Sequence, residues 1–149
     1  MKIEEAIQSR FQNDVQKAVI NVLYTASFIG QQQQQFFKKF NLTSQQYNVL
    51  RILNGSQPNP LTVAEIISRM IDKSSNASRL IDRLEKKSLV ERRICKKDRR
   101  QVDVNISDKG LQLLADIAPH IEQMERTFNQ LSPGELTQLN ELLDKFRKP

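Results

Sequence analysis

The sequence of 149 residues contains one cysteine, one histidine, four glycines and no tryptophan, and these shortages exclude several kinds of site. A single cysteine cannot form an internal disulfide, and one cysteine with one histidine leaves too few ligands for a structural zinc site. We therefore expect neither a bound metal nor a cofactor. The lone thiol also agrees with a reducing, cytoplasmic environment.

Sequence signals for catalysis and for membrane insertion are missing as well. The chain has no phosphate-binding glycine loop, no nucleophile elbow and no pair of histidines, so we expect no enzymatic activity. No run approaches the roughly 18 consecutive apolar residues of a membrane-spanning helix. The first ten residues, MKIEEAIQSR, include acidic residues and no apolar block, which predicts that they are not a secretory signal.

The chain does have long stretches of helical periodicity. Its length and its hydrophobic content of 38% predict one domain with helical extensions. An apolar stripe from Ile3 to Ile29 predicts a first helix of roughly 25 or more residues, which Gly30 is expected to bend or end. The glutamine tract at 31–35 is expected to form an exposed helical turn, because glutamine favours helix.

Hydroxyl residues mark the starts of further helices. Thr43, Thr62 and Ser132 each precede a glutamine or glutamate by three residues, a spacing at which the side chains and the backbone cap each other. Ser107 gives a weaker start, with an acid directly after it. The predicted helices cover about 43–53, 62–70, 107–130 and 132–147, and Pro119 is expected to kink the third of these.

Another helix is expected to begin at residue 73 or 74, about three residues after the helix at 62–70. Its apolar face consists of Ala77, Leu80, Ile81 and Leu84. The short connection is typical of a helix-turn-helix, in which the second helix lies in the major groove of DNA.

Positive charge is concentrated around this motif. Residues 69–100 contain 12 lysines and arginines and 5 aspartates and glutamates, a net charge of +7. The rest of the chain has 11 lysines and arginines and 12 aspartates and glutamates, a net charge of −1. The whole positive excess of the chain, +6, therefore lies in this segment. Clustered cations gain free energy by releasing the counterions condensed on nucleic acid. The alternative is a solvated basic face on an ordinary helix.

Two runs with β character, Val90–Ile94 and Val102–Ile106, flank the basic turn CKKDRRQ. A polar helix followed at once by a hairpin with a basic tip favours DNA binding over a merely solvated face. We predict a mainly α fold, a winged helix-turn-helix with a small β-hairpin wing and long N- and C-terminal helices. The apolar stripes of the first and last helices exceed what a small core needs, which predicts a dimer; packing within one chain is the alternative.

The motifs LT at 42–43, VAEI at 63–66, SRLIDRLEKK at 78–87, LVER at 89–92, DRR at 98–100 and ISDKG at 106–110 occur in this order. Together they resemble the MarR family of transcriptional regulators over about residues 42–110. The resemblance implies a homodimer, with dimerisation helices at 1–40 and 107–149 and a DNA-binding lobe at 41–106. It also implies repression, less often activation, of promoters with near-palindromic sites. Many members of the family release DNA when a small phenolic or lipophilic effector binds between the lobe and the dimerisation helices.

The resemblance implies DNA-binding roles for ten residues. Five would lie early in the recognition helix and meet bases and phosphates: Ser74, Ser75, Asn76, Ser78 and Arg79. At the wing tip, Arg100 would reach into the minor groove while Asp98 holds its guanidinium in place. Three neighbouring cations would contact phosphates: Lys96, Lys97 and Arg99.

Some assignments stay open at this point. For one of Arg92 and Arg93, an internal salt bridge to Asp82 or Asp98 competes with a DNA contact. Ser88 stands where the family usually has a glycine that permits a left-handed helix cap, so serine either accepts strain or ends the helix differently. The angle between the wing and the recognition helix depends on which of these occurs.

An effector pocket is expected around five residues, with Met124 as a further candidate: Tyr24, Phe28, Tyr47, Arg51 and His120. The alternative is that the aromatic residues belong to the core and that the histidine is structural or exposed. Cys95 lies beside two lysines that favour its thiolate, so it is either an oxidant sensor or a bystander.

A non-specific architectural DNA-binding protein would show the same basic patch. Ser75, Asn76 and Ser78 favour base reading over that alternative, because short polar groups discriminate among bases in a way that lysines alone do not. The expected partners are therefore double-stranded DNA, a second copy of the chain and a small-molecule effector, with no membrane.

Overall fold

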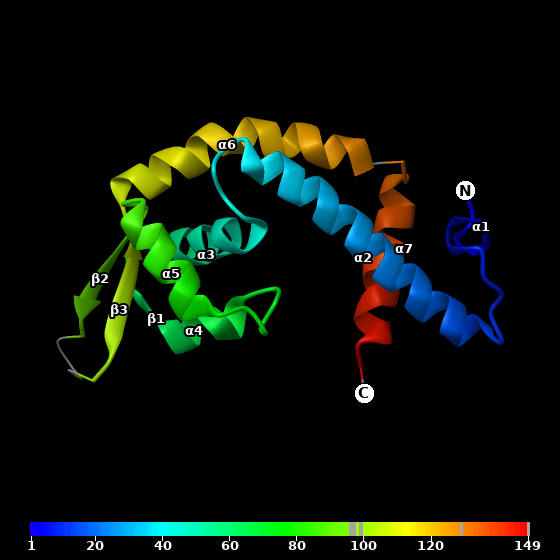
Figure 1. Ribbon diagram of the computed structural model, residues 1–149, viewed down its shortest axis with the longest axis horizontal. Coiled ribbons are helices and arrows are strands. Elements are labelled where there is room, and N and C mark those ends of the chain that lie inside the picture. The colour runs from blue at the N-terminus through cyan, green and yellow to red at the C-terminus, as the bar shows by residue number, and fades with distance from the viewer. Residues whose placement is uncertain (96–97, 99, 129, 149) are drawn as a thin grey trace. The chain divides into compact units, whose positions relative to one another are not determined.

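The computed structural model describes residues 1–95, 98, 100–128 and 130–148, and it divides into two compact units, residues 1–111 and 112–149 (Figure 1). The chain is mainly helical, with one small antiparallel sheet in the first unit. This arrangement confirms the predicted fold class. Among the described residues, no helix combines the length and the apolar character needed to cross a membrane.

Two helices, and not one, form the N-terminal part of the first unit. Helix α1 covers Ile3–Ile7 and helix α2 covers Asp14–Lys38, so the prediction of one helix continuing from Ile3 is wrong. Gln8 ends α1 in a left-handed conformation, with φ at 51°. Asn13 starts α2 by accepting a hydrogen bond of 2.8 Å from the backbone N–H of Gln16. A local cap therefore overrides the apolar periodicity on which the prediction depended.

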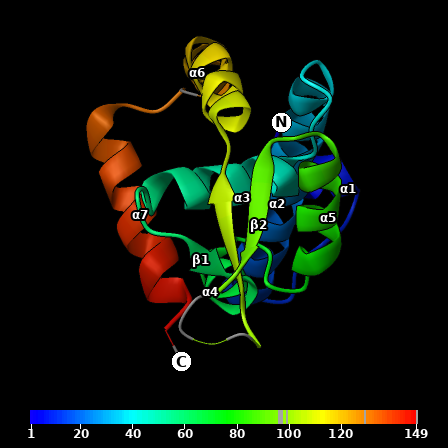
Figure 2. The ribbon, with the colours of Figure 1, turned by 90° about the vertical axis from the view of Figure 1, so that its left-hand side faces the viewer.

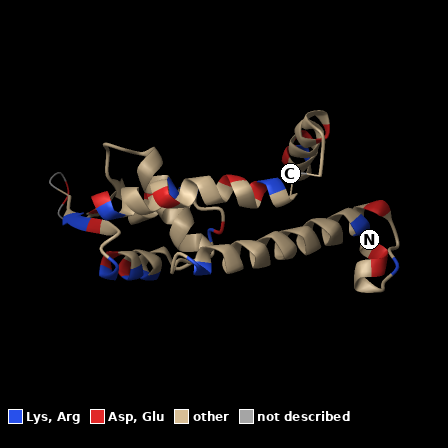
Figure 3. Ribbon diagram, turned by 90° about the horizontal axis from the view of Figure 1, so that it is seen from above, with Lys and Arg blue, Asp and Glu red and all other residues tan. Residues whose placement is uncertain are grey.

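Helix α2 continues through Gly30 and through the glutamine tract at 31–35. Four of the five glutamines are exposed, which confirms the predicted helical turn, whereas Gly30 does not end the helix. Between Lys17 and Lys38 the helix carries no charged residue, and Figure 3 shows this part as a long ribbon without charge colours. Such a surface is poorly suited to contact a phosphate backbone.

Three helices build the lobe that follows, α3 (Ser44–Gly55), α4 (Val63–Arg69) and α5 (Ala77–Lys86). The predicted capping boxes are present in the first two. At α3, Thr43 and Gln46 exchange hydrogen bonds of 3.1 Å in both directions between side chain and backbone. At α4, the backbone N–H and the hydroxyl of Thr62 hold the pKa of the Glu65 carboxyl below its ordinary value. Both helices therefore begin where the sequence predicted.

The sheet has the strand order β1-β3-β2, with β1 at Leu61–Thr62, β2 at Val90–Ile94 and β3 at Val102–Ile106. The bounds of β2 and β3 are those predicted, and Ile94 pairs with Val102 next to the wing turn. Sequence patterning missed β1, because two residues are too short to show alternation. Figure 2 shows α3 behind the hairpin and α5 beside it.

The core of the first unit forms where the three lobe helices pack on one another and on the sheet. Six of its side chains are completely buried: Val49, Leu50, Ile66, Ile81, Leu84 and Val104. Each such side chain contributes about 1.5–3 kcal/mol relative to an exposed one. Because α5 turns its apolar stripe into this core, its polar and charged residues face outward.

A tight junction joins the end of α5 to β2 and to the start of α6 (Asp108–Phe128). Ser88 accepts a left-handed conformation, with φ at 60°, and Leu89 N–H closes the helix on the Leu84 carbonyl at 2.9 Å. Ser107 then donates its hydroxyl to the Ser88 carbonyl at 2.7 Å and its N–H to the Leu89 carbonyl at 3.1 Å. Serine thus adopts the conformation usual for glycine, at a cost of about 1–2 kcal/mol.

The second unit contains most of α6 and helix α7, Pro133–Phe146. The bounds of both helices agree with the prediction to within two residues, and α6 remains one helix across Pro119. The capping box at Ser132 and Glu135 is present. None of the residues of α7 is buried, and four of its large apolar side chains are exposed: Leu136, Leu139, Leu142 and Phe146.

We expect Gly110→Ala to lower the free energy of unfolding by about 1–3 kcal/mol through overpacking. A Cβ at this position would lie 2.3 Å from the Leu89 carbonyl oxygen, a backbone atom that cannot move without disturbing the junction. Gly30→Ala is the matched control, because a Cβ there would meet nothing within 4 Å. In α2 this control should raise stability by about 0.5–1 kcal/mol. Urea titrations at equal protein concentration measure both, and equal effects would contradict the close contact.

Candidate nucleic-acid interface

The connection between α4 and α5 is longer than the sequence suggested. Helix α4 ends at Arg69 and α5 begins at Ala77, so residues 70–76 form the connection and the predicted helix start at 73 or 74 is wrong. The Asp72 carboxylate organises this turn by accepting hydrogen bonds from the Ser74 N–H at 3.0 Å and the Ser75 hydroxyl at 3.1 Å. Ser74 and Ser75 therefore lie in the turn before the helix and not within it.

Asp72 is a residue that sequence reasoning missed. Its carboxylate also accepts the Ser74 hydroxyl at 2.5 Å, and the two serines together hold its pKa below the ordinary value. The signal was present, because an aspartate two residues before a serine is a common side-chain-to-backbone turn. The carboxylate therefore remains charged at neutral pH and keeps the entrance to α5 ordered.

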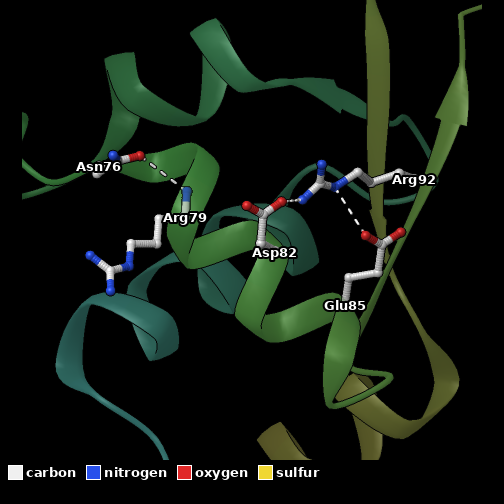
Figure 4. A network of polar contacts seen from close by, with 5 residues as sticks. All are labelled: Asn76, Arg79, Asp82, Glu85 and Arg92. Atoms are coloured by element: carbon white, nitrogen blue, oxygen red, sulfur yellow. Dashed lines mark hydrogen bonds and ion pairs between the residues drawn. The ribbon is translucent and has the colours of Figure 1, made fainter.

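Asn76 is the N-cap of α5. Its side-chain oxygen accepts a hydrogen bond of 3.1 Å from the Arg79 backbone N–H, as Figure 4 shows. Ser78 and Arg79 are exposed in the first turn, on the side opposite the buried Ala77. The start of α5 thus presents short polar groups and one guanidinium outward, while Asn76 also has a structural role that sequence reasoning did not assign.

Arg92 on β2 is held by two carboxylates of α5. Its guanidinium pairs with Asp82, and its Nε lies 3.3 Å from Glu85 Oε2 (Figure 4). That Nε atom is shielded from solvent and makes no hydrogen bond among the described residues, so its contact with Glu85 is a charge interaction only. The open choice for Arg92 is therefore decided in favour of the internal salt bridge to Asp82. Sequence reasoning missed Glu85, which lies one turn further along the same face of α5.

The other wing arginine is arranged differently. Arg93 pairs with Glu91 at 3.1 Å, and 73% of its side chain is exposed. At the wing tip, the Asp98 carboxylate accepts the Arg100 backbone N–H at 3.0 Å and lies 3.6 Å from the Arg100 Nε. The Arg100 side chain is 95% exposed, so its guanidinium extends into solvent next to the carboxylate that orients it. Lys96, Lys97 and Arg99 lie outside the described residues.

The predicted effector residues occur in three places. Tyr24 and Phe28 lie one turn apart on α2 and are 43% and 50% exposed. On α3, Tyr47 stacks on Phe37 with ring centroids 4.5 Å apart, and Arg51 is exposed one turn further along. His120 is exposed on α6 in the second unit. The pocket stays a prediction.

Comparison with known proteins yields the same family from sequence and from structure. The MarR family model matches residues 42–102. The uncharacterized HTH-type transcriptional regulator YkoM of Bacillus subtilis is 35% identical over 109 residues, which cover 72% of this chain and 70% of that protein. A crystal structure of a MarR transcription factor from Planctomyces limnophilus is 33% identical, with a TM-score of 0.70, and the match covers 91% of this chain and 98% of that chain.

The chain belongs to the MarR family of transcriptional regulators. A third similar protein is S. aureus MepR, in a crystal structure of its complex with DNA, with 26% identity and a TM-score of 0.75. That match covers 85% of this chain and 93% of the MepR chain. MarR proteins are DNA-binding transcription factors and not enzymes, which agrees with the expectations from the sequence.

In this MarR protein, we expect Arg92 and Asp82 to be energetically coupled. A double-mutant cycle with Arg92→Gln and Asp82→Asn should give a coupling energy of about 0.5–1 kcal/mol, because solvent screens the partly exposed pair. Arg147 and Asp144 form the control pair, since both side chains are about two-thirds exposed, 67% and 69%. The coupling energy of this control pair should be close to zero. Urea titrations of each single and double variant measure both coupling energies. Equal coupling in the two pairs would mean that Arg92 does not anchor the wing.

Proposed function

We propose that this protein is a homodimeric, sequence-specific regulator that represses transcription by binding a near-palindromic operator. In this proposal residues 41–106 form the DNA-binding lobe, and residues 1–40 and 107–149 form the dimerisation helices. The observation that carries the proposal is the joint exposure of the first turn of α5 and of the arginine at the wing tip. One element suits the major groove and the other the minor groove.

The charge of the lobe supports binding to a phosphate backbone. Residues 69–100 hold a net charge of +7, and the two carboxylates nearest the middle of α5 are both engaged by Arg92. These acids are therefore turned toward the wing strand and away from the start of the helix. Counterion release then favours DNA, with an affinity that falls steeply as salt increases.

The start of α5 supports base reading over non-specific binding. Ser78 and Arg79 are exposed in its first turn, and an arginine fork matches the O6 and N7 acceptors of guanine. Ser74 and Ser75, placed in the preceding turn, are better suited to contact phosphates than bases. Asn76 keeps its amide N–H groups for DNA while its oxygen caps the helix.

The wing tip supports an ordered minor-groove contact. Asp98 holds both the backbone and the side chain of Arg100, which lowers the entropy that the guanidinium loses on entering a narrow groove. We assign the phosphate contacts beside it to Lys96, Lys97 and Arg99.

Exposed apolar side chains support the homodimer. On α2 they are Val15, Val19, Val22 and Leu23, and on α7 they are Leu136, Leu139, Leu142 and Phe146. Large apolar side chains at helical spacing on two helices are unfavourable in water unless a partner covers them. A second copy of the chain is the simplest partner, because it also pairs two recognition helices on a palindrome.

The proposal includes a cytoplasmic location and a small phenolic or lipophilic effector. The aromatic rings of Tyr24 and Phe28 share one face of α2, where a flat ligand could stack on them. Tyr47, Arg51 and His120 complete the predicted pocket.

We expect Arg100→Ala to weaken operator binding by tenfold or more and to reduce the salt slope by about two, one for each copy in the dimer. Fluorescence anisotropy on a duplex selected from a random DNA pool measures both quantities. Arg147→Ala is the control, because it removes an exposed arginine near the C-terminus. If Arg100→Ala binds selected and random duplexes as the wild type does, the wing assignment is wrong. A wild type without preference between those duplexes would favour the architectural alternative.

We expect Leu139→Glu with Leu142→Glu to weaken dimerisation by at least tenfold, because two carboxylates would be placed on the apolar face of α7. Sedimentation equilibrium at micromolar concentration measures the dissociation constant. Ile71→Glu is the control, since Ile71 is 90% exposed and lies outside the helices. A wild type that is monomeric at these concentrations would contradict the dimer.

A further inference from the structure

A second basic feature lies at the other end of α5, away from the residues assigned to DNA. An open cleft of about 360 Å³ lies among the end of α2, the start of α3 and the last turns of α5. Four cations line it, Lys38, Arg83, Lys86 and Lys87, and none of its described lining residues is acidic. The volume is within the range of small-molecule sites, roughly 300–1,000 Å³.

The cations of this cleft are not neutralised by neighbours. Among the described residues, Lys38, Arg83 and Lys86 make no ion pair, and Lys87 donates to the Asn41 backbone carbonyl. The acids that alternate with them on α5 are engaged by Arg92 on another side of the helix. Placing like charges around one cleft is unfavourable, and an anion bound there would relieve the repulsion.

A buried amide adds a neutral donor to the same cleft. Gln46 lines it and is only 3% exposed. Its side-chain oxygen accepts the Thr43 backbone N–H at 3.1 Å, whereas its amide nitrogen has no hydrogen-bond partner among the described residues. Among the described residues, this nitrogen is not one of the buried atoms that lack a partner, so it stays accessible and can donate to a ligand in the cleft. The adjacent first turn of α3, a helix of 12 residues, also favours negative charge.

We propose that this cleft binds a small molecule through a phosphate group. A guanidinium from Arg83 suits two phosphate oxygens at once, lysines on both sides supply further charge, and the Gln46 amide donates to a remaining oxygen. Along the helix, Arg83 lies about 9 Å and Lys86 about 13 Å beyond Ala77 at the start of α5, at 1.5 Å per residue. A free ligand therefore fits it better than the duplex that the other end of α5 would contact.

Occupancy would add charged contacts among three elements, the end of α2, the start of α3 and the end of α5. The phosphate would bridge Lys38 at the end of α2 to Arg83 and Lys86 on the recognition helix. A ligand that binds one arrangement of these helices more tightly changes the affinity for anything else that prefers that arrangement. DNA affinity is thus a second readout, which rests on the proposed function, whereas binding of the ligand itself does not.

The test is isothermal titration of the full chain with pyrophosphate at constant ionic strength and without DNA. We expect saturable binding of one pyrophosphate per chain. Gln46→Glu should weaken it by at least tenfold, because it replaces the donor with a carboxylate yet keeps the acceptor that caps α3. The double variant Arg83→Gln with Lys86→Gln should weaken pyrophosphate binding by a similar factor. It provides the test if Gln46→Glu does not fold. Lys39→Gln, which removes a neighbouring exposed cation outside the cleft, should leave the affinity within twofold of wild type.

Two outcomes would overturn the proposal. If Gln46→Glu or the double variant binds pyrophosphate as Lys39→Gln does, the binding is general attraction to a basic protein. If a bound duplex displaces pyrophosphate and the double variant loses DNA affinity as strongly as Arg100→Ala, the cleft is a contact for the DNA backbone. Because pyrophosphate binding is measured without DNA, a failure of the regulator assignment leaves this result unaffected.

Discussion

The fold of the lobe depends on one close backbone contact, where the Leu89 carbonyl lies against Gly110. Any side chain at residue 110 would bring a Cβ within 2.3 Å of that oxygen, so the start of α6 can approach the end of α5 only as glycine. Ser88 turns the chain sharply enough to allow this approach, and Ser107 fixes it with two hydrogen bonds. A single junction therefore positions the recognition helix, the wing strand β2 and the first residues of α6 within the first unit.

Charge is sorted around α5 by the same geometry. Because β2 leaves the junction beside α5, Arg92 reaches Asp82 and Glu85 and engages both acids of the helix. Within the described part of the chain, the cations of α5 consequently keep no carboxylate of the helix as a partner. Arg79 is exposed at the start of the helix, and Arg83 and Lys86 line the basic cleft towards its end. A helix of nearly balanced composition thus acquires two positive regions, since the wing neutralises only its negative side chains.

Most helix starts and both wing strands could be predicted from local chemistry. Capping boxes at Thr43, Thr62 and Ser132 depend on residues three apart, and each strand of the hairpin is a five-residue run that begins with valine and ends with isoleucine. The errors arose where a local side chain competed with the periodic pattern. Asn13 caps a new helix, α2, within the predicted first helix, and the turn organised by Asp72 places the start of α5 later than predicted. The spacing of apolar residues carries no information about either side chain.

The sequence by itself determined the fold class, the hairpin bounds, the location of the positive charge and the family, because these depend on composition, short-range periodicity and motif order. Only the tertiary structure decided that Arg92 pairs with acids of α5 while Arg93 and Arg100 are exposed to solvent. All three are arginines in one basic segment, so the sequence does not distinguish their environments. It also decided that Lys38 and Gln46 share a cleft with the end of α5. Residues about forty positions apart meet there through packing of the core, which no local pattern encodes.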